Sequence, residues 1–137
     1  MPDPVALTLP ADSAAMAKVQ AAVDAFCETH EMAPRPAYVL ALVVEELVTN
    51  VVNHAYKGTR GGPVTVFVGE EAGAIVGEVS DDGPPFDPTV ASTPDTAAAL
   101  DERPIGGLGV HIVKTLVERL DYARDGDRNV VRFRIPL

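Results

Sequence analysis

Hydrophobic residues repeat with two different periods in the first part of this chain. Over residues 5–10 they alternate with polar or small residues and stop at Pro10, which predicts a short strand because strand side chains point to alternate faces. Asp12 or Ser13 can cap a helix that follows and continues to about His30. A strand and a helix are therefore the first elements expected.

The middle of the chain predicts a second helix and a hairpin. After a break that contains two prolines, apolar residues recur at helical spacing over about 37–56. A loop with three glycines, 57–62, separates this helix from two stretches of alternation, 64–68 and 75–79. The link between the two stretches, 70–73, is short enough for an antiparallel hairpin.

The last part of the chain begins without periodicity. Residues 87–105 hold three prolines among alanine, threonine and aspartate, and a long loop of this kind inside a compact domain is often a lid. A helical pattern returns over 108–120, and alternation over 131–135 predicts a last strand. We expect one α+β domain over 1–137, with helices on one face of a mixed, largely antiparallel sheet.

Composition narrows the classes of function. The chain has 137 residues, 47% of them hydrophobic, and a net charge of −9, so one core can form and phosphate-neutralising nucleic-acid binding is not expected. We find no run of roughly 18 apolar residues and no secretory start, so we expect a cytoplasmic protein without a membrane segment. The three histidines lack the spacing of zinc ligands.

A polar ridge interrupts the valine-rich second helix. Glu46, Asn50 and Asn53 recur at steps of four and three residues and so line one ridge. A carboxylate one turn from a carboxamide can orient or deprotonate a nucleophile, while the amide oxygen helps to hold Mg²⁺. Polar residues on a helix are more often solvated surface, and the flanking valines favour a cleft.

A second cluster follows the hairpin, over residues 80–87. Alternation places Asp81 on the same face as Val79 and Ile75, hence toward the core. A buried carboxylate needs a hydrogen-bond donor, and the amino group of adenine would supply one. The alternative is that Asp-Asp-Gly-Pro makes only a turn.

A third cluster, Gly106-Gly107-Leu108-Gly109, opens the last predicted helix. Three glycines in four positions let a ligand approach the backbone, and the N–H groups of the helix start favour phosphate. An ordinary hinge is the alternative. The lysine and Ser or Thr of a P-loop are missing, and no strand precedes the glycines directly.

Together, in this order and spacing, the three clusters resemble a known superfamily. They look like the N, G1 and G2 boxes of the ATPases shared by DNA gyrase, histidine kinases, heat-shock chaperones and mismatch-repair proteins. Four phrases are similar to the anti-sigma-factor serine kinases of bacterial partner-switching systems: Glu45-Glu46-Leu47-Val48-Thr49-Asn50, His54-Ala55-Tyr56, Pro85-Phe86-Asp87-Pro88 and Arg103-Pro104-Ile105-Gly106-Gly107-Leu108-Gly109.

The resemblance implies a fold and roles for the site residues. The fold would be the two-layer α/β sandwich of these ATPases, the Bergerat fold, with an ATP lid over about 87–106. Glu46 would be the general base toward a protein serine, Asn50 the Mg²⁺ ligand, and Asp81 the residue that binds adenine. The remaining residues implied in ATP binding are Asn53, Gly83, Phe86, Arg103, Gly106, Gly107, Leu108, Gly109 and Val110.

The resemblance also implies partners. They would be a sigma factor and a STAS-type anti-anti-sigma antagonist, and a homodimer is expected. Lys18 and Thr49 resemble partner-contact positions, with ordinary surface residues as the alternative. Arg103 is the one cation of the lid and would approach the γ-phosphate or the partner, with a solvated loop arginine as the alternative.

The chain departs from the family pattern at two points. Pro85 stands where the G1 box often has a second glycine, which stiffens the turn. Many relatives place a threonine near adenine from the last strand region, and residues 127–130 contain none, so Asn129 is a candidate substitute through hydrogen bonding.

Three functions remain open at the level of sequence. The first is a serine protein kinase that is also an anti-sigma factor, using Mg²⁺ and ATP to phosphorylate the antagonist. The second is a non-catalytic, ATP-gated module that sequesters a partner. The third is a plain ATPase, ranked last because the sequence offers no water-positioning group apart from Glu46.

Overall fold

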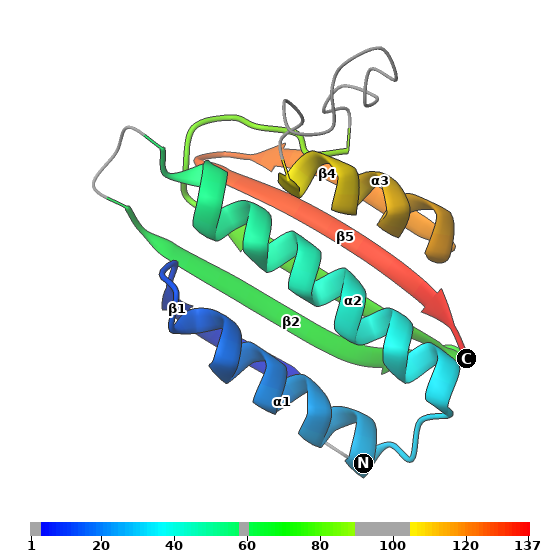
Figure 1. The fold of residues 1–137 in the computed structure, drawn as a ribbon. Helices are drawn as coiled ribbons and strands as arrows, with labels where there is room; N and C mark the ends of the chain where they lie inside the picture. Colours follow the sequence, from blue (N-terminus) through cyan, green and yellow to red (C-terminus); the bar gives the residue numbers. More distant parts are fainter. Residues whose placement is uncertain (1–3, 58–60, 90–104) are drawn as a thin grey trace.

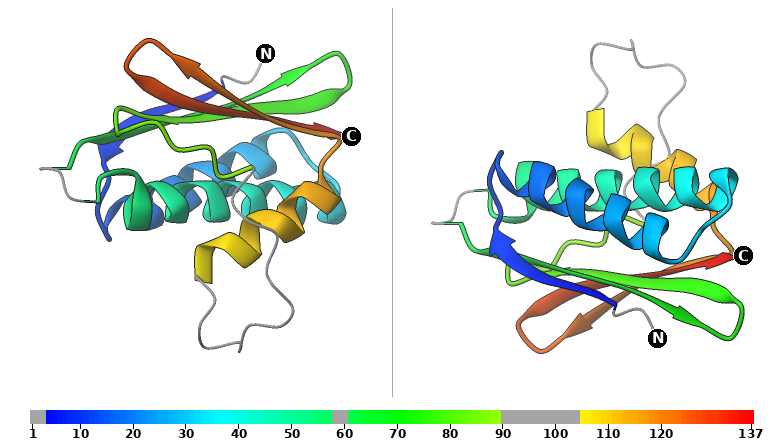
Figure 2. Two further views of the ribbon diagram at one scale, coloured as in Figure 1. Left: turned by 90° about the horizontal axis from the view of Figure 1, so that it is seen from above. Right: turned by 90° about the horizontal axis from the view of Figure 1, so that it is seen from below.

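The computed structural model describes residues 4–57, 61–89 and 105–137, with side chains described outside 105–109. Three α-helices lie on one face of a five-stranded sheet, so the molecule has two layers (Figures 1 and 2). The helices are α1 Ala15–Thr29, α2 Pro34–Asn50 and α3 Ile105–Leu116, and one turn of π-helix, η1 Val51–Ala55, continues α2. The strands are β1 Val5–Pro10, β2 Pro63–Glu71, β3 Ala74–Asp81, β4 Arg119–Asp125 and β5 Arg128–Pro136.

The sheet has the strand order β1-β2-β3-β5-β4. Every pair of neighbouring strands is antiparallel, so the expected α+β class is confirmed, while the sheet formed by the described strands is antiparallel throughout rather than mixed. The predicted β2–β3 hairpin closes through Ala72 and Gly73, whose φ values of 49° and 76° are those of a two-residue turn with both positions left-handed.

Alternation decides which strand residues enter the core. In β3, Ile75 and Val79 point toward the helices and are buried, and Gly77 between them leaves room for the ring of Phe133 on β5. A Cβ atom at Gly77 would lie 2.1 Å from that ring, so a larger residue there would require the Phe133 ring to move. The inward side chains of the sheet meet the apolar face of α2, which includes Leu40, Val43, Val44, Leu47 and Val48.

The segment Pro34–Ala55 has the length and apolar composition of a membrane span. In this fold it is the central helix of the helical layer, between α1 and α3 (Figure 1). Its most buried residues, such as Leu40 and Val43 at 0% exposure, pack into the core of the domain. Its hydropathy is therefore explained by its place in the core.

Two predicted helix starts differ from the structure. Helix α2 begins at Pro34 rather than about residue 37, because proline is well accommodated in the first helical turn, where its missing N–H has no partner to lose. Helix α1 begins at Ala15, and Asp12 accepts a hydrogen bond from the Ala14 N–H at 2.9 Å, one residue before the helix. Ser13 makes no side-chain cap in the described structure.

The largest difference is β4, which the sequence pattern did not predict. The helix expected over 108–120 ends at Leu116, and Leu120 lies in the strand, opposite Phe133 of β5. The β4–β5 hairpin turns at Gly126, with φ of 60°, and Asp127. A Gly-Asp pair between two alternating stretches is typical of a hairpin, and this pair is the feature of the sequence that indicates β4.

Candidate functional site

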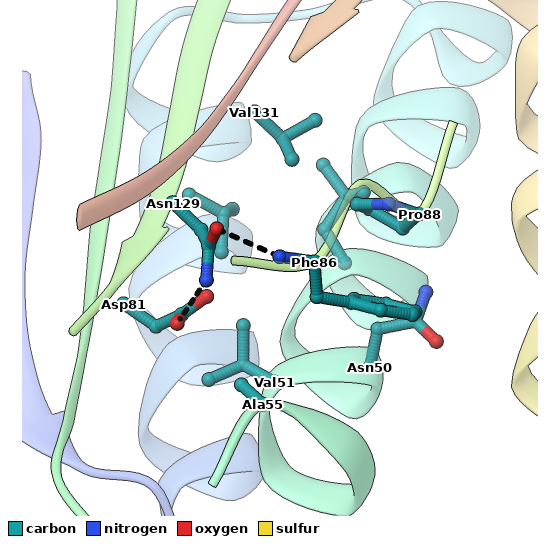
Figure 3. A pocket seen from close by; sticks show the side chains of 10 residues that line it. Asn50, Val51, Ala55, Asp81, Phe86, Pro88, Asn129 and Val131 are labelled. Carbon is teal, nitrogen blue, oxygen red and sulfur yellow. Dashed lines mark hydrogen bonds between the residues drawn. The ribbon is translucent and has the colours of Figure 1, made fainter. Parts of the chain in front are cut away.

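A small pocket opens where the end of α2, η1, the end of β3 and β5 meet. Figure 3 shows Asp81 and Asn129 on the sheet side, Asn50 on the helix side, and the segment of Phe86 and Pro88 between them. The walls combine apolar side chains with a few polar groups, as small-molecule sites do. The pocket is lined by Leu47, Asn50, Val51, Ala55, Val79, Asp81, Phe86, Pro88, Asn129 and Val131.

Asp81 lies at the last position of β3 and points toward the core, as its alternation predicted. It is only 7% exposed. Its Oδ1 accepts hydrogen bonds from the Gly83 N–H at 2.8 Å and from Asn129 Nδ2 at 2.9 Å. Within the described residues no hydrogen bond reaches Oδ2, so this oxygen remains available to a donor from a ligand.

Gly83 packs directly on the end of the π-helical turn. A Cβ atom at this position would lie 2.2 Å from the carbonyl oxygen of Ala55, so any larger residue would force the two segments apart. The neighbouring Asp82 N–H donates to the Tyr56 hydroxyl at 2.8 Å, and that hydroxyl donates to the Pro63 carbonyl. Two contacts thus fix the Asp81–Gly83 turn against the end of the helix.

Asn50 is the polar residue that α2 supplies to the pocket. It is 6% exposed, and its Nδ2 is buried without a hydrogen-bond partner in the described structure. An unsatisfied buried amide is costly, which points to a ligand that completes it. The carboxamide can offer Oδ1 to Mg²⁺ and Nδ2 to a phosphate oxygen, so the residue fits the role expected for it.

No group of three acidic, histidine or cysteine side chains that could hold a metal occurs among the described residues. A Mg²⁺ ion at Asn50 would therefore take most of its ligands from water and phosphate, as this ion commonly does.

Glu46 lies one turn before Asn50 on α2 and is half-buried, and it does not line the pocket. Partial burial raises the pKa of the Glu46 carboxyl above its usual range, and the neighbouring charge of Glu45 raises it further. A raised pKa makes the carboxylate a stronger proton acceptor, which suits a general base.

Asn53, the third residue of the predicted ridge, is exposed and does not line the pocket. It lies in the π-helical turn that begins directly after Asn50. A π-turn carries one more residue per hydrogen-bonded ring than an α-turn, so the spacing that aligned the three residues fails beyond Asn50. The structure brings together Asn50 and the residues of the β3 turn, without Asn53.

The predicted phosphate side is described only in part. Most of the lid, including Arg103, lies outside the described residues. The backbone of 106–109 belongs to the first turn of α3, which begins at Ile105 rather than after the glycines. Val110 is buried, at 2% exposure, and is not in the wall of the pocket.

The two predicted partner-contact residues are on the helical layer. Lys18 is exposed on α1, and Thr49 is half-buried on α2 beside Asn50.

Phe86, which the resemblance also assigns to ATP binding, lines the pocket together with Asn50 and Asp81 and is 41% exposed.

The β4–β5 hairpin supplies polar groups that the sequence did not predict for the site. Tyr122 and Arg124 of β4 both donate to Asn129 Oδ1, at 2.6 and 3.2 Å, and Arg124 also donates to the Gly83 carbonyl at 2.7 Å. These contacts depend on the register of β4 with β5, which places Arg124 opposite Asn129.

Comparison with known proteins identifies the family to which this chain belongs. Residues 9–135 match the family described as "Histidine kinase-like ATPase domain". The match spans nearly the whole chain, and the protein belongs to this family of ATPase domains.

Two curated relatives are protein kinases. The chain is 27% identical over 90 residues to serine/threonine-protein kinase BtrW of Bordetella bronchiseptica, covering 66% of this chain and 63% of that protein. It is 31% identical over 96 residues to serine-protein kinase RsbW of Listeria monocytogenes, covering 67% of this chain and 61% of that protein. The match therefore spans less than two thirds of the length of either relative.

Solved structures confirm the fold. The crystal structure of the RsbU and RsbW domains of Rv1364c from Mycobacterium tuberculosis superposes with a TM-score of 0.73 at 17% identity, covering 99% of this chain and 33% of that chain. The histidine kinase domain of a blue-light activated histidine kinase from Erythrobacter litoralis gives a TM-score of 0.54 at 20% identity, covering 94% of this chain and 62% of that one.

The contact between Gly83 and Ala55 yields a prediction. Replacing Gly83 with alanine should weaken ATP binding by roughly tenfold or more, because relieving the clash with a backbone oxygen moves the turn that carries Asp81. The rise in melting temperature caused by ATP measures the loss. In the control Gly69→Ala, the added atom meets the ring of the exposed Phe67 at 3.2 Å and the side chain of Pro4 at 3.6 Å, and ATP should still stabilise the variant. Wild-type affinity in Gly83→Ala would contradict the assignment of this turn to the nucleotide site.

Proposed function

We propose that this chain is an ATP-dependent serine/threonine protein kinase that also acts as an anti-sigma factor. The observation that carries the proposal is the pocket that joins an unsatisfied Asn50 on α2 to an inward-facing Asp81 at the end of β3. The family is one of ATPase domains, and the two curated relatives named above are protein kinases.

Each polar group of the pocket has a distinct task in this proposal. Asp81 Oδ2 accepts a hydrogen bond from the amino group of adenine, and Gly83 holds the turn that carries Asp81 close against Ala55. Asn50 binds on the phosphate side and holds Mg²⁺ through its amide oxygen. When bound, Mg²⁺ neutralises charge on the phosphates.

Glu46 is the general base in this mechanism. Its carboxylate takes the proton of a serine hydroxyl on the protein substrate as the serine oxygen attacks the γ-phosphorus. The bond from that phosphorus to the bridging oxygen breaks, and ADP leaves with that oxygen. The raised pKa of Glu46 assists this proton transfer at neutral pH.

We propose the partners from the resemblance of the sequence to the anti-sigma-factor serine kinases. The substrate is a STAS-type anti-anti-sigma antagonist, whose phosphorylation returns the kinase to its sigma factor. Lys18 on α1 and Thr49 on α2 are the proposed contacts with these partners, and the working form is a homodimer in the cytoplasm.

Transfer of radiolabelled γ-phosphate to a cognate STAS protein tests the proposal. We expect label on a serine of the STAS protein that depends on Mg²⁺ and on the kinase. ATP-dependent capture of a sigma factor without any labelled product would instead establish a non-catalytic binding module. Release of free phosphate at the same rate with and without partners would indicate a plain ATPase.

A further inference from the structure

Asn129, opposite Asp81 in the β3–β5 register, lines the pocket and joins a network of side-chain hydrogen bonds. It is 3% exposed. Its Nδ2 donates to Asp81 Oδ1 at 2.9 Å and to the Pro84 carbonyl at 2.8 Å, with the Gly83 carbonyl at 3.4 Å. Its Oδ1 accepts from the Phe86 N–H at 3.1 Å and from Tyr122 and Arg124 at 2.6 and 3.2 Å.

These contacts use the whole hydrogen-bonding capacity of the amide. A carboxamide has two N–H donors and two acceptor lone pairs, and protein groups occupy all of them. Asn129 therefore has no group left for a nucleotide, and it does not replace a family threonine by contacting adenine directly. Any effect on the ligand must pass through the residues that it holds.

The residue that it holds most directly is Asp81. Two donors, Asn129 Nδ2 and the Gly83 N–H, both reach Oδ1 and thereby fix the rotation of the carboxylate. Oδ2 then faces the pocket as a pure acceptor. An acceptor at this position pairs with an amino group on a base and repels a carbonyl oxygen.

The hairpin of β4 and β5 fixes the direction of the amide. If the Asn129 amide rotated by half a turn, its oxygen would face Asp81 and its N–H groups would face the donors of Tyr122 and Arg124. That orientation is unfavourable on both sides, so the donors of β4 keep Nδ2 directed at Asp81.

We propose that Asn129 is the positioning residue that gives the pocket its preference for a base with an amino group, and that Tyr122 supports it. The inference rests on the proposed binding of ATP. It adds that base selectivity comes from a network built by β4 and β5, rather than from Asp81 alone.

Paired nucleotides test the inference, because inosine triphosphate carries a carbonyl where ATP carries the amino group. We would measure the affinity of each for the wild type, Asn129→Asp and Tyr122→Phe. Asn129→Asp keeps the shape and the acceptor but removes the donors and sets a carboxylate against Asp81. It should weaken ATP binding by roughly 10- to 100-fold, the range for a hydrogen bond to a charged group, and leave inosine triphosphate unchanged or improved. Tyr122→Phe should reduce the preference for ATP in part.

The control is Tyr38→Phe, which removes the same hydroxyl from a tyrosine that is 66% exposed on α2, and it should keep the wild-type preference. An equal loss of both nucleotides in Asn129→Asp and Tyr122→Phe would overturn the inference, because it would mean that Asn129 only holds the loop. If Asn129→Asp does not fold, an unchanged preference in Tyr122→Phe overturns it as well. A wild type that binds neither nucleotide would overturn the proposed function itself.

Discussion

Replacing Glu46 with glutamine is expected to abolish phosphotransfer while ATP binding persists. The substitution keeps the size of the side chain but removes the proton acceptor, and the loss of a general base lowers a rate by about 10²- to 10⁴-fold. Glu46 does not line the pocket, so affinity for ATP should be close to that of the wild type. Rates of γ-phosphate transfer and equilibrium binding of ATP separate the two effects.

The raised pKa of Glu46 gives the same experiment a second readout. The folded state binds the Glu46 proton more readily than the unfolded state, so ionisation costs stability as pH rises from the ordinary glutamate pKa through the raised one. Glutamine cannot ionise, and Glu46→Gln should therefore be at least as stable as the wild type at neutral pH. Thermal denaturation checks this, and it distinguishes lost catalysis from lost folding.

The raised pKa of Glu46 also predicts how the rate of phosphate transfer depends on pH. A base acts only as the carboxylate, so transfer should fall as pH decreases through the raised pKa of Glu46 and should level off above it. In the control Glu45→Gln, removal of the neighbouring charge should move this fall to lower pH and leave the rate at neutral pH unchanged. Wild-type transfer by Glu46→Gln would show that another group is the base.

The parts of the site that depend on local periodicity could be predicted from the sequence. A period of two fixes the face on which Asp81 lies, and a period of 3.6 places Asn50 one turn from Glu46. The structure places both Asp81 and Asn50 at the pocket. Neither conclusion required knowledge of which strands pair.

The parts of the fold and of the site that depend on pairing between distant segments could not be predicted from the sequence. Leu116, Val117 and Leu120, which span the end of α3 and the start of β4, have a spacing that fits a continuous helix as well as it fits the observed elements. The hydrogen bond from Asn129 to Asp81 joins residues 48 positions apart, and it exists only in the observed β3–β5 register. The π-turn after Asn50 leaves no mark in the hydrophobic pattern, so the exposure of Asn53 was not expected.

Replacing Asn50 with alanine is expected to remove both ATP binding and phosphotransfer. The substitution deletes the only polar group that α2 presents to the pocket in the described structure, and with it the proposed Mg²⁺ ligand. Unlike Glu46→Gln, it should therefore fail at the binding step. In the wild type, ATP at 100 times its Kd should raise the free energy of unfolding by about 2.7 kcal/mol, and in Asn50→Ala this increment should vanish.

The protein without nucleotide should not lose stability in Asn50→Ala. The Nδ2 of Asn50 is buried and unpaired, so its removal relieves a desolvation cost of about 1–3 kcal/mol, and alanine also favours the helix more than asparagine does. We expect the variant to unfold at the wild-type temperature or above it. The control Gln20→Ala deletes a carboxamide from the exposed face of α1 and should keep the full response to ATP.

The dependence on Mg²⁺ decides whether Asn50 acts through the metal. With a chelator present, the wild type should lose much of its affinity for ATP, whereas Asn50→Ala should bind equally weakly with and without Mg²⁺. Asn50→Asp, which keeps an oxygen at the same position, should retain part of the Mg²⁺-dependent affinity. A variant Asn50→Ala whose affinity still rises with Mg²⁺ as steeply as that of the wild type would contradict the assignment, and the metal would then have to be held by other groups.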